Sequence, residues 1–478
     1  MASYIEEISK LQISQRISLL KERMLSEPRF LSIEQALLIT KCYKENENLP
    51  RILQRAKSLA LALNEIEIRI DPLELIVGNR TAGVRAGVVS PEAGISWIDH
   101  EIETLHERPQ DKFNVRKEDI EEFRNTILPY WKGKSLEDAV KDRVGAEISA
   151  IGKVVKINQT DHAQGHICPN TQKWLELGPA GLKKEAEEKI KTASADKKLF
   201  YESVIIVLSA AQDFMRRYSK LAQKMLEEVS DSSLRENLSE IERICSKLAD
   251  KPPETFREAV QSMWFLFVIL QMESNASSFS PGRADQYLYP YFKKDIDSGR
   301  LDLSGALEII EALWLKFNQI VYLRNSNSAK YFAGFPIGFN IACGGQTQDG
   351  KDASNELSFL FLKAQEHLLL PQPNLSARLF KGSSSEFVDQ CSRVIGMGSG
   401  MPQIFNDESI IPALINQGIS KEDAANYAIV GCVELTTHGN NLGWSDAAMF
   451  NLVKVLELTL NNGICLQTGI QMGLQTGY

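Results

Sequence analysis

Apolar residues recur three or four positions apart through most of the first 273 residues of the chain. This spacing places them on one face of a helix, so we expect a largely helical first half whose helices pack by that face. The predicted helices cover residues 32–44, 48–64, 117–150, 182–190, 194–229, 233–248 and 252–273. Residues 75–78 form a short apolar run closed by glycine, and this pattern predicts a strand.

The pattern changes after about residue 273. Short apolar runs flanked by glycine alternate there with helical patterns, which is typical of βα units whose strands are buried in a barrel or sheet. The predicted strands are 337–343, 374–380 and 402–406, and the predicted helices are 303–323, 353–369, 385–394 and 408–416. The predicted fold class is therefore α/β. No linker or low-complexity segment divides the chain, which favours one domain over residues 1–478.

Two more helices are predicted near the end of the chain. A start that resembles a capping box at Ser420 predicts a helix to Tyr427, and this helix would lead directly into Gly431 and Cys432. The second helix is predicted over residues 447–460, before a glycine stop signal.

The composition narrows the class of protein. Hydrophobic residues make up 43% and charged residues 24% of the chain, as in an ordinary globular protein, and the net charge of −8 argues against a nucleic-acid or membrane partner. The N-terminus lacks the basic and apolar regions of a secretion signal, and the longest apolar run, 263–270, is far shorter than a membrane span. Seven cysteines without paired spacing suggest neither a zinc site nor disulfides. We therefore expect a cytoplasmic protein.

The most informative local chemistry lies where the apolar residues 428–430 lead to Cys432, with Glu434 two positions later. A thiol and a carboxylate side by side in an apolar setting are costly, so we expect a buried loop that is kept for a use. From these residues alone, Cys432 is either a buried structural thiol or a nucleophile with His438 as its base. The six histidines show no paired spacing on a predicted helix, so a metal site is less well supported.

Five short segments share their order and spacing with those of one known family. They are Gly-Cys-Val-Glu at 431–434, Gly-Trp-Ser-Asp at 443–446, Glu-Ser-Asn at 273–275, Ser-Pro-Gly-Arg at 280–283 and Asp-Gln-Tyr at 285–287. With them, the chain resembles the glycyl radical enzymes related to pyruvate formate-lyase, over nearly its whole length. The resemblance implies a pyruvate formate-lyase-like α/β barrel, similar to a ten-stranded barrel of two half-barrels, surrounded by helices. The chain looks closest to the diol and hydroxyproline dehydratases. It departs from pyruvate formate-lyase itself, which has two adjacent cysteines, because Gly431 stands in the first place.

The resemblance implies catalytic roles for four residues. Cys432 would carry a thiyl radical that abstracts hydrogen from a hydroxyl-bearing carbon, and Glu434 would deprotonate that hydroxyl so that the β-leaving group is expelled. His166 and Asp446 match the family's positions for protonating the departing hydroxyl. We therefore expect a glycyl radical lyase of the dehydratase type, which cleaves a C–O bond in a small hydroxylated substrate. Each residue also has a structural alternative: Glu434 as a loop carboxylate, Asp446 as a helix N-cap and His166 as a loop histidine.

Three further residues are expected to bind substrate by the same resemblance. Ser278 keeps the serine of the diol-type enzymes, whereas Ser277 replaces a histidine that would bind substrate hydroxyls there. Phe339 is expected to line the pocket. Because Ser277 is short and uncharged, glycerol and propanediol are not safe expectations, and C–N cleavage, C–S cleavage and decarboxylation stay open.

The family carries its radical on a glycine in an Arg-Val-x-Gly-aromatic loop far C-terminal to the cysteine, and this sequence ends at Tyr478. We therefore expect the glycyl radical domain to be absent, the barrel to be incomplete at its C-terminus, and the chain to be inactive alone. Neither a bound cofactor nor a metal is expected. The resemblance implies a glycyl radical on the missing segment, installed by a radical SAM activating enzyme, and a homodimer. Two other readings are a non-catalytic fragment that needs a partner, and a two-electron thiol enzyme that uses Cys432 as a nucleophile.

Overall fold

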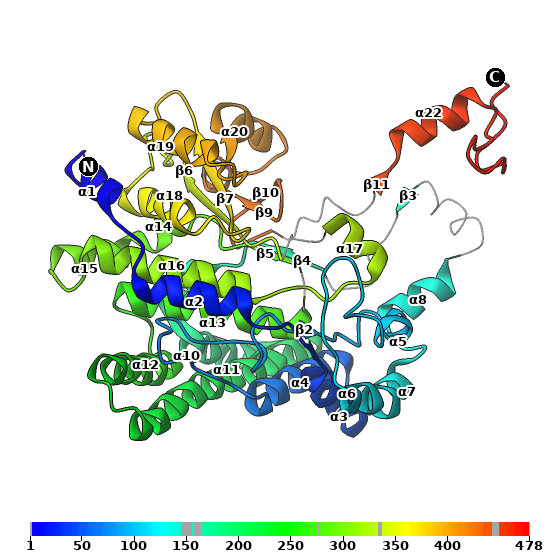
Figure 1. Ribbon diagram of the computed structural model, residues 1–478, viewed down its shortest axis with the longest axis horizontal. Helices are drawn as coiled ribbons and strands as arrows, with labels where there is room; N and C mark the ends of the chain where they lie inside the picture. The colour runs from blue at the N-terminus through cyan, green and yellow to red at the C-terminus, as the bar shows by residue number, and fades with distance from the viewer. Residues whose placement is uncertain are drawn as a thin grey trace.

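Long helices form the first half of the molecule, as the spacing of apolar residues predicts (Figure 1). The structure, a computed structural model, describes residues 2–144, 155–156, 164–275, 277–332, 337–441 and 449–477. The longest helices, α11 (Ala195–Glu228) and α12 (Ser232–Asp250), pack along one another. The other helices of this half are α1 (Ala2–Lys10), α2 (Gln15–Ser26), α3 (Glu34–Glu45), α4 (Arg51–Glu65), α5 (Ser96–Glu101), α6 (Lys117–Glu122), α7 (Leu128–Trp131), α8 (Leu136–Arg143), α10 (Thr171–Lys189) and α13 (Phe256–Ser274).

Helix α13 runs through the centre of the core and ends next to the candidate site. Its N-terminus is fixed by a capping box, in which the Thr255 side chain accepts a hydrogen bond from the Glu258 N–H and the Glu258 carboxylate accepts one from the Thr255 N–H. Almost every side chain between Phe256 and Met272 is buried, which is the pattern of a helix covered on all sides. The helix ends at Asn275, which adopts a left-handed conformation with φ of 44°. The chain therefore changes direction at Asn275, and the next strand, which is also buried, begins at Ser277.

The second half contains parallel strands covered by helices, which confirms the predicted α/β class. β6 (Asn340–Gly344), β7 (Asn374–Leu379) and β8 (Gln403–Asn406) form a parallel sheet with Asn340 opposite Asn374. β4 (Gln164–Ile167) pairs in parallel with β5 (Ser277–Phe279), and β9 (Tyr427–Val430) forms an antiparallel hairpin with β10 (Glu434–Thr437). The remaining strand pairs are β1 (Leu31–Ser32) with β2 (Gly87–Val88), and β3 (Val155–Lys156) with β11 (Met449–Phe450).

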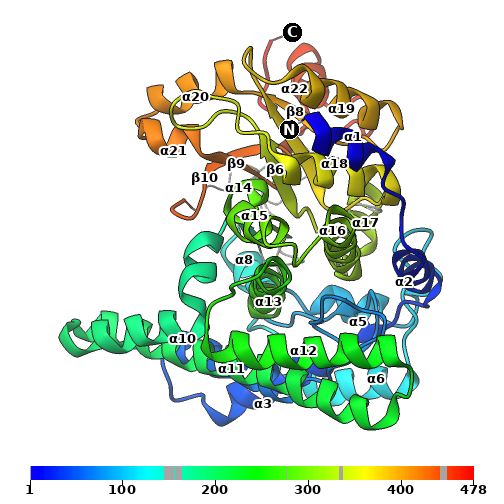
Figure 2. The same ribbon diagram turned by 90° about the vertical axis from the view of Figure 1, so that its left-hand side faces the viewer.

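The helices of this half surround the strands. Figure 2 shows α13 and α16 in a middle layer, with α11 and α12 on one side of it and the sheet with α18 to α21 on the other. The helices are α14 (Ala284–Tyr287), α15 (Tyr289–Asp297), α16 (Leu303–Gln319), α17 (Ser326–Phe332), α18 (Glu356–Leu368), α19 (Ser385–Gly396), α20 (Asp407–Asn416), α21 (Lys421–Ala425) and α22 (Leu452–Leu460). Within the part of the chain that the structure describes, none of the helices has the length and apolar character that a bilayer crossing needs.

The strand predicted over residues 75–78 is wrong. This segment is a buried loop whose backbone is paired with side chains of α13. The Val77 N–H donates to Oε1 of Gln261 at 2.8 Å, and Nε2 of Gln261 donates to the Val77 carbonyl at 2.7 Å. The indole N–H of Trp264 donates to the Gly78 carbonyl at 2.8 Å. Because these side chains satisfy the polar groups that a neighbouring strand would otherwise pair, the apolar run is buried without a sheet.

Four predicted helices differ from the structure. The helix predicted over 182–190 is the end of α10, which begins at Thr171 and is kinked at Gly178. Helix α21 ends at Ala425, and the strand β9 rather than a helix leads to Gly431, because aromatic and β-branched residues in 427–430 fit a buried hairpin strand. Within the described residues of 447–460, β11 precedes a helix that begins only at Leu452, where the Asn451 side chain caps it. The helix predicted over 117–150 breaks into α6, a π-helical turn over Phe123–Ile127, α7 and α8, and its last residues, 145–150, lie outside the described residues.

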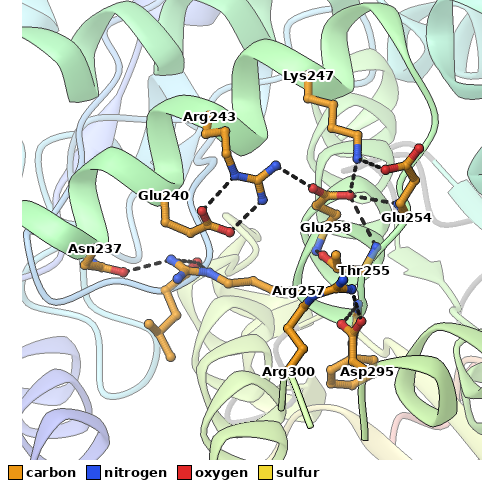
Figure 3. Close-up of polar contacts among 12 residues, drawn as sticks. Asn237, Glu240, Arg243, Lys247, Glu254, Thr255, Arg257, Glu258, Asp295 and Arg300 are labelled. Carbon is orange, nitrogen blue, oxygen red and sulfur yellow. Dashed lines mark hydrogen bonds and ion pairs between the residues drawn. The ribbon is translucent and has the colours of Figure 1, made fainter. Parts of the chain in front are cut away.

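The buried carboxylate of Glu258, on α13, binds two basic side chains of α12 (Figure 3). Glu258, of which 1% of the side chain is exposed, accepts hydrogen bonds of 2.8 Å from Nη1 of Arg243 and from Nζ of Lys247. It also accepts one from the backbone N–H of Glu254 at 2.8 Å. Burial raises the pKa of Glu258, but these hydrogen bonds outweigh it, so the pKa lies below its ordinary value.

Candidate active site

The hairpin of β9 and β10 carries Cys432 in its connecting loop. All four residues of β9 are buried, and Gly431 after them is buried too. Cys432 and Val433 are exposed, however. The expectation that Cys432 lies in a buried loop is therefore wrong for this structure. The buried strand holds the loop in place, and the thiol stands on its open side.

Gly431 is held from three directions by buried side chains. Its N–H donates to Oγ of Ser280 at 3.2 Å. Its carbonyl accepts hydrogen bonds from Nδ2 of Asn340 at 3.0 Å and from Nδ2 of Asn374 at 3.1 Å. Asn340 and Asn374 are the first residues of β6 and β7 and stand opposite one another in the sheet. The backbone immediately before Cys432 is therefore anchored to the ends of two parallel strands and to the segment after β5.

A residue larger than glycine does not fit at position 431. Gly431 has φ of 60°, in the left-handed region. A Cβ atom there would lie 2.8 Å from Oγ of Ser278 and 3.1 Å from Nε2 of His166. Gly431, Ser278 and His166 are therefore in close contact, and a side chain at position 431 would have to displace the Ser278 hydroxyl and adopt the left-handed conformation.

His166 and Glu434 form the ionisable pair of the site. Nε2 of His166 lies 3.0 Å from Oε1 of Glu434, and 7% and 12% of the two side chains are exposed. The backbone N–H of Val433 donates to Oε2 of Glu434 at 3.1 Å. Burial raises the pKa of Glu434, but the hydrogen bonds from His166 and Val433 outweigh it, so the pKa lies below its ordinary value. Glu434 is therefore an ionised carboxylate at neutral pH. We place the hydrogen of this contact on Nε2 of His166, so that the imidazole donates and the carboxylate accepts.

Several residues around the pair of His166 and Glu434 have unusual backbone conformations. His166 has φ of 43° and Ser278 has φ of 63°, which non-glycine residues rarely adopt, and Gly338 has φ of 80°. His166 lies in the irregular part of the pairing between β4 and β5, and the Ser278 N–H donates to the Ile337 carbonyl at 2.8 Å. Strained residues of this kind persist where packing holds them, and they are enriched at functional sites.

Four of the seven sequence-predicted site residues meet here. Cys432, Glu434, His166 and Ser278 lie on or next to the same hairpin loop. Ser277 is buried next to Ser278 and pairs with Gln164. Asp446 lies outside the described residues.

The ring of Phe339 lies in the core and packs on Phe317 at 4.7 Å between ring centroids, with Phe267 and Trp264 further away. This packing favours a structural role for the ring, and substrate binding by Phe339 stays a prediction.

His438 does not serve Cys432 as a base. Strand β10 lies between the two residues, and four residues of strand extend over about 13 Å. The imidazole of His438 packs on the Tyr287 ring, and burial lowers its pKa to about 4. It is a neutral packing group.

Sequence reasoning missed the anchoring role of Ser280, Asn340 and Asn374. Ser280 opens one of the five shared segments, and the two asparagines stand in predicted strands, but nothing in their spacing indicated a common target. Among the described residues, no group of three histidine, cysteine or acidic side chains could hold a metal ion.

The comparisons with known proteins agree with this arrangement. Residues 9–478 match the family described as "Pyruvate formate lyase-like". The chain is similar to (2S)-3-sulfopropanediol dehydratase from Klebsiella oxytoca, at 31% identity over 97% of this chain and 58% of the relative. It is also similar to an isethionate sulfite-lyase from Oleidesulfovibrio alaskensis, at 32% identity over 94% of this chain and 56% of the relative.

A solved structure shares the fold. The glycerol-bound form of the B12-independent glycerol dehydratase from Clostridium butyricum matches with a TM-score of 0.93 and 36% identity, over 97% of this chain and 60% of that one. The chain thus spans somewhat more than half the length of the proteins that it matches. On its sequence and its fold, the chain belongs to the pyruvate formate lyase-like family.

Proposed function

We propose that the protein containing this chain is a glycyl radical lyase that removes a leaving group from a small hydroxylated substrate, with cleavage of a C–O bond. The observation that carries the proposal is the pair of His166 and Glu434 beside the loop of Cys432. Because its pKa is lowered, Glu434 is in the ionised form, the form that can accept a hydroxyl proton. The similarity to dehydratases supports the same reaction class.

The proposed steps use these residues in sequence. A thiyl radical at Cys432 takes a hydrogen atom from the hydroxyl-bearing carbon of the substrate, and the thiol forms. Glu434 takes the hydroxyl proton, the resulting ketyl radical expels the β-hydroxyl group, and that group receives a proton back from the pair of Glu434 and His166 and leaves as water. The Cys432 thiol then returns its hydrogen atom to the product radical, which restores the thiyl radical.

His166 supports both proton transfers in this proposal. While Glu434 is ionised, the Nε2–H of His166 donates to it and orients the carboxylate. Once Glu434 holds the substrate proton, the pair passes one proton to the departing hydroxyl by way of His166, and Glu434 is ionised again. Asp446 remains the second proposed acid, from the sequence resemblance. Ser278 and Ser277 are the proposed substrate contacts next to this pair.

The radical and the partners are part of the same proposal. The radical would arise on a backbone glycine of a segment outside this sequence, and a radical SAM enzyme would install it. A homodimer in the cytoplasm is the proposed assembly. We propose that the exposed side of the Cys432 loop faces the remaining part of the family fold, since the matched relatives are longer than this chain.

The test is anaerobic activation of the complete protein with a radical SAM activating enzyme, followed by EPR. We expect a glycine-centred radical and loss of water from one member of a panel of diols, hydroxyprolines and hydroxylated sulfonates. Release of sulfite without dehydration would instead place the protein with the C–S lyases, which the similarity to isethionate sulfite-lyase makes the second candidate. A radical that forms but consumes none of these substrates contradicts the proposed reaction class.

A further inference from the structure

A cavity of about 250 Å³ lies away from the Cys432 loop, beneath the C-terminal end of α2. Five apolar and five polar residues line it, and the three charged side chains among them lie together and form its polar end. The apolar lining comes from Met24, Leu25, Val321, Leu370 and Pro371, and the polar lining from Arg29, Arg85, Asp111, Asn318 and Tyr322.

The polar end carries more positive than negative charge. Two guanidinium groups, of Arg29 and Arg85, face one carboxylate, of Asp111. The ion pair between Arg29 and Asp111 is long, at 3.6 Å, and Arg29 also lies over the ring of Phe113 at 4.9 Å. Since one carboxylate balances one of the two cations, the lining has a net charge of about +1.

Arg85 is weakly held for a guanidinium in this position. Its one hydrogen bond runs from Nη1 to the Met24 carbonyl at 3.4 Å, and among the described residues it forms no ion pair within 4.0 Å. Burial lowers the pKa of Arg85, and the neighbouring charge of Arg29 lowers it further, whereas Asp111 raises it. An anion between the two arginines would relieve both effects.

The backbone at this end is strained as well. Arg85 has φ of 57° and Asp111 has φ of 48°, both in the left-handed region that non-glycine residues rarely adopt. Two charged residues of a cavity lining therefore hold unfavourable conformations that direct their side chains to it. Strain of this kind persists at ligand sites.

From this geometry we infer that the cavity binds a small organic anion, with a carboxylate or sulfonate between Arg29 and Arg85 and a short apolar body against Val321, Leu370 and Pro371. The apolar residues favour an organic anion over inorganic phosphate, because phosphate would leave them uncovered. Arginine pairs suit the flat, two-oxygen face of a carboxylate.

The cavity is linked to the candidate active site through one buried arginine. Arg80 donates hydrogen bonds to the carbonyl of Val321, which lines the cavity, and to Oδ1 of Asn275. Asn275 lies at the end of α13, close before Ser277 and Ser278 on β5. A ligand in the cavity therefore contacts Val321, and the hydrogen bonds of Arg80 connect Val321 to Asn275, just before the proposed substrate contacts Ser277 and Ser278.

The experiment is saturation-transfer NMR and calorimetry on the full chain with butyrate and propane-1-sulfonate, and with butyramide and phosphate as comparison probes. We expect both organic anions to saturate the protein, at least about tenfold more tightly than butyramide or phosphate. Arg85→Gly removes the cation and also relieves the positive φ, so it should keep the fold and weaken both anions about tenfold or more. Arg29→Gln should act in the same direction.

The controls separate this cavity from other sites. Arg216→Gln removes an equal charge from the exposed face of α11 and should leave binding unchanged. His166→Ala should also leave it unchanged, because the anions bind away from the Cys432 loop. If binding is lost in His166→Ala but kept in Arg85→Gly, the anions occupy the active site and the inference is overturned. Equal binding of butyramide, or no saturable binding of either anion, overturns it as well.

Discussion

Nε2 of His166 lies 3.0 Å from Oε1 of Glu434 although 268 positions separate the two residues in the sequence. His166 comes from β4, next to β5, and Glu434 opens β10 directly after the Cys432 loop. The two strands belong to different sheets, and the segments that follow them meet directly, because the N–H of Gly439 donates to the carbonyl of Cys168 at 2.9 Å. The pair therefore depends on the packing of the hairpin against the segment of β4.

Replacement of Glu434 should remove the proposed base. In the activated enzyme, Glu434→Gln keeps the shape of the side chain but cannot accept a proton, and we expect the turnover rate to fall about 10²–10⁴-fold. The measurement is initial rate under anaerobic conditions, with the radical content determined by EPR. Glu408→Gln, at an exposed position of α20, is the matched control. A rate within threefold of the parent would rule out the base assignment.

Gly431→Ala should destabilise the protein and close the site. The new Cβ would approach Oγ of Ser278 at 2.8 Å, and the left-handed conformation adds its own strain. We expect a loss of about 2–4 kcal/mol in the free energy of unfolding, measured in urea. Gly469→Ala is the control, because Gly469 has φ of 68° but no atom within 4 Å of its Cβ position. The free energy of unfolding of Gly469→Ala should fall by only about 1–2 kcal/mol. Equal losses would show that the contact with Ser278 contributes nothing.

The two asparagines that hold the Gly431 carbonyl should act as a unit. Asn340→Ala removes the buried hydrogen bond to the Gly431 carbonyl, and Asn374→Ala removes its own bond to that carbonyl and the one that its Oδ1 accepts from Nε2 of Gln372 at 2.9 Å. We expect each substitution to cost about 1–3 kcal/mol of unfolding free energy. A double-mutant cycle should show a coupling energy of at least about 0.5 kcal/mol, because both amides share one acceptor. Additive losses would mean that the two amides stabilise the structure independently.

Cys432 should be the fastest thiol to alkylate. It is exposed, whereas the other six cysteines are buried in the structure. Burial raises the pKa of Cys168, Cys245 and Cys343, and raises that of Cys391 to about 12, so these thiols should react slowly. Mass spectrometry after a short pulse of iodoacetamide should find Cys432 modified first, and Cys432→Ser should abolish this label whereas Cys391→Ser should not. Cys465 should label second, because a hydrogen bond with Thr468 lowers its pKa although only 3% of the residue is exposed. Early labelling elsewhere, with Cys432 unmodified, would contradict the exposed loop.

The carboxylate that joins α12 to α13 should make stability depend on pH. The pKa of Glu258 is lower in the folded protein than its ordinary value of 4.5. Its contribution is therefore present above about pH 4.5 and is lost as the pH falls through the folded-state value. Glu258→Gln should cost about 1–3 kcal/mol at pH 7, and less at pH 4 and below. Urea unfolding at several pH values tests this, with Glu254→Gln at the exposed end of the same network as the control. If the stability difference between Glu258→Gln and the parent protein grows as the pH falls, the pKa of Glu258 is not lowered in the folded protein.

Much of the secondary structure could be predicted from spacing alone. The bounds predicted for α11, α13 and the strand β7 agree with the structure within a few residues, because each has a continuous apolar pattern on a face that becomes buried. The candidate residues of the hairpin loop, Cys432 and Glu434, were also found by sequence, since they stand two positions apart after a buried run. Local spacing is encoded in the order of side chains and needs no knowledge of distant contacts.

The tertiary structure decided what spacing could not. Residues 75–78 are predicted as a strand, but side chains of α13, Gln261 and Trp264, pair with their backbone instead. Cys432 is predicted to be buried, but it is exposed. The sequence by itself determined the α/β class, the bounds of most of the long helices and of the buried strands, and the four candidate residues that meet at the hairpin loop. Only the fold decided that His166 meets Glu434 and that Ser280, Asn340 and Asn374 hold Gly431, because such contacts depend on left-handed backbone turns and on packing between segments that are far apart along the chain.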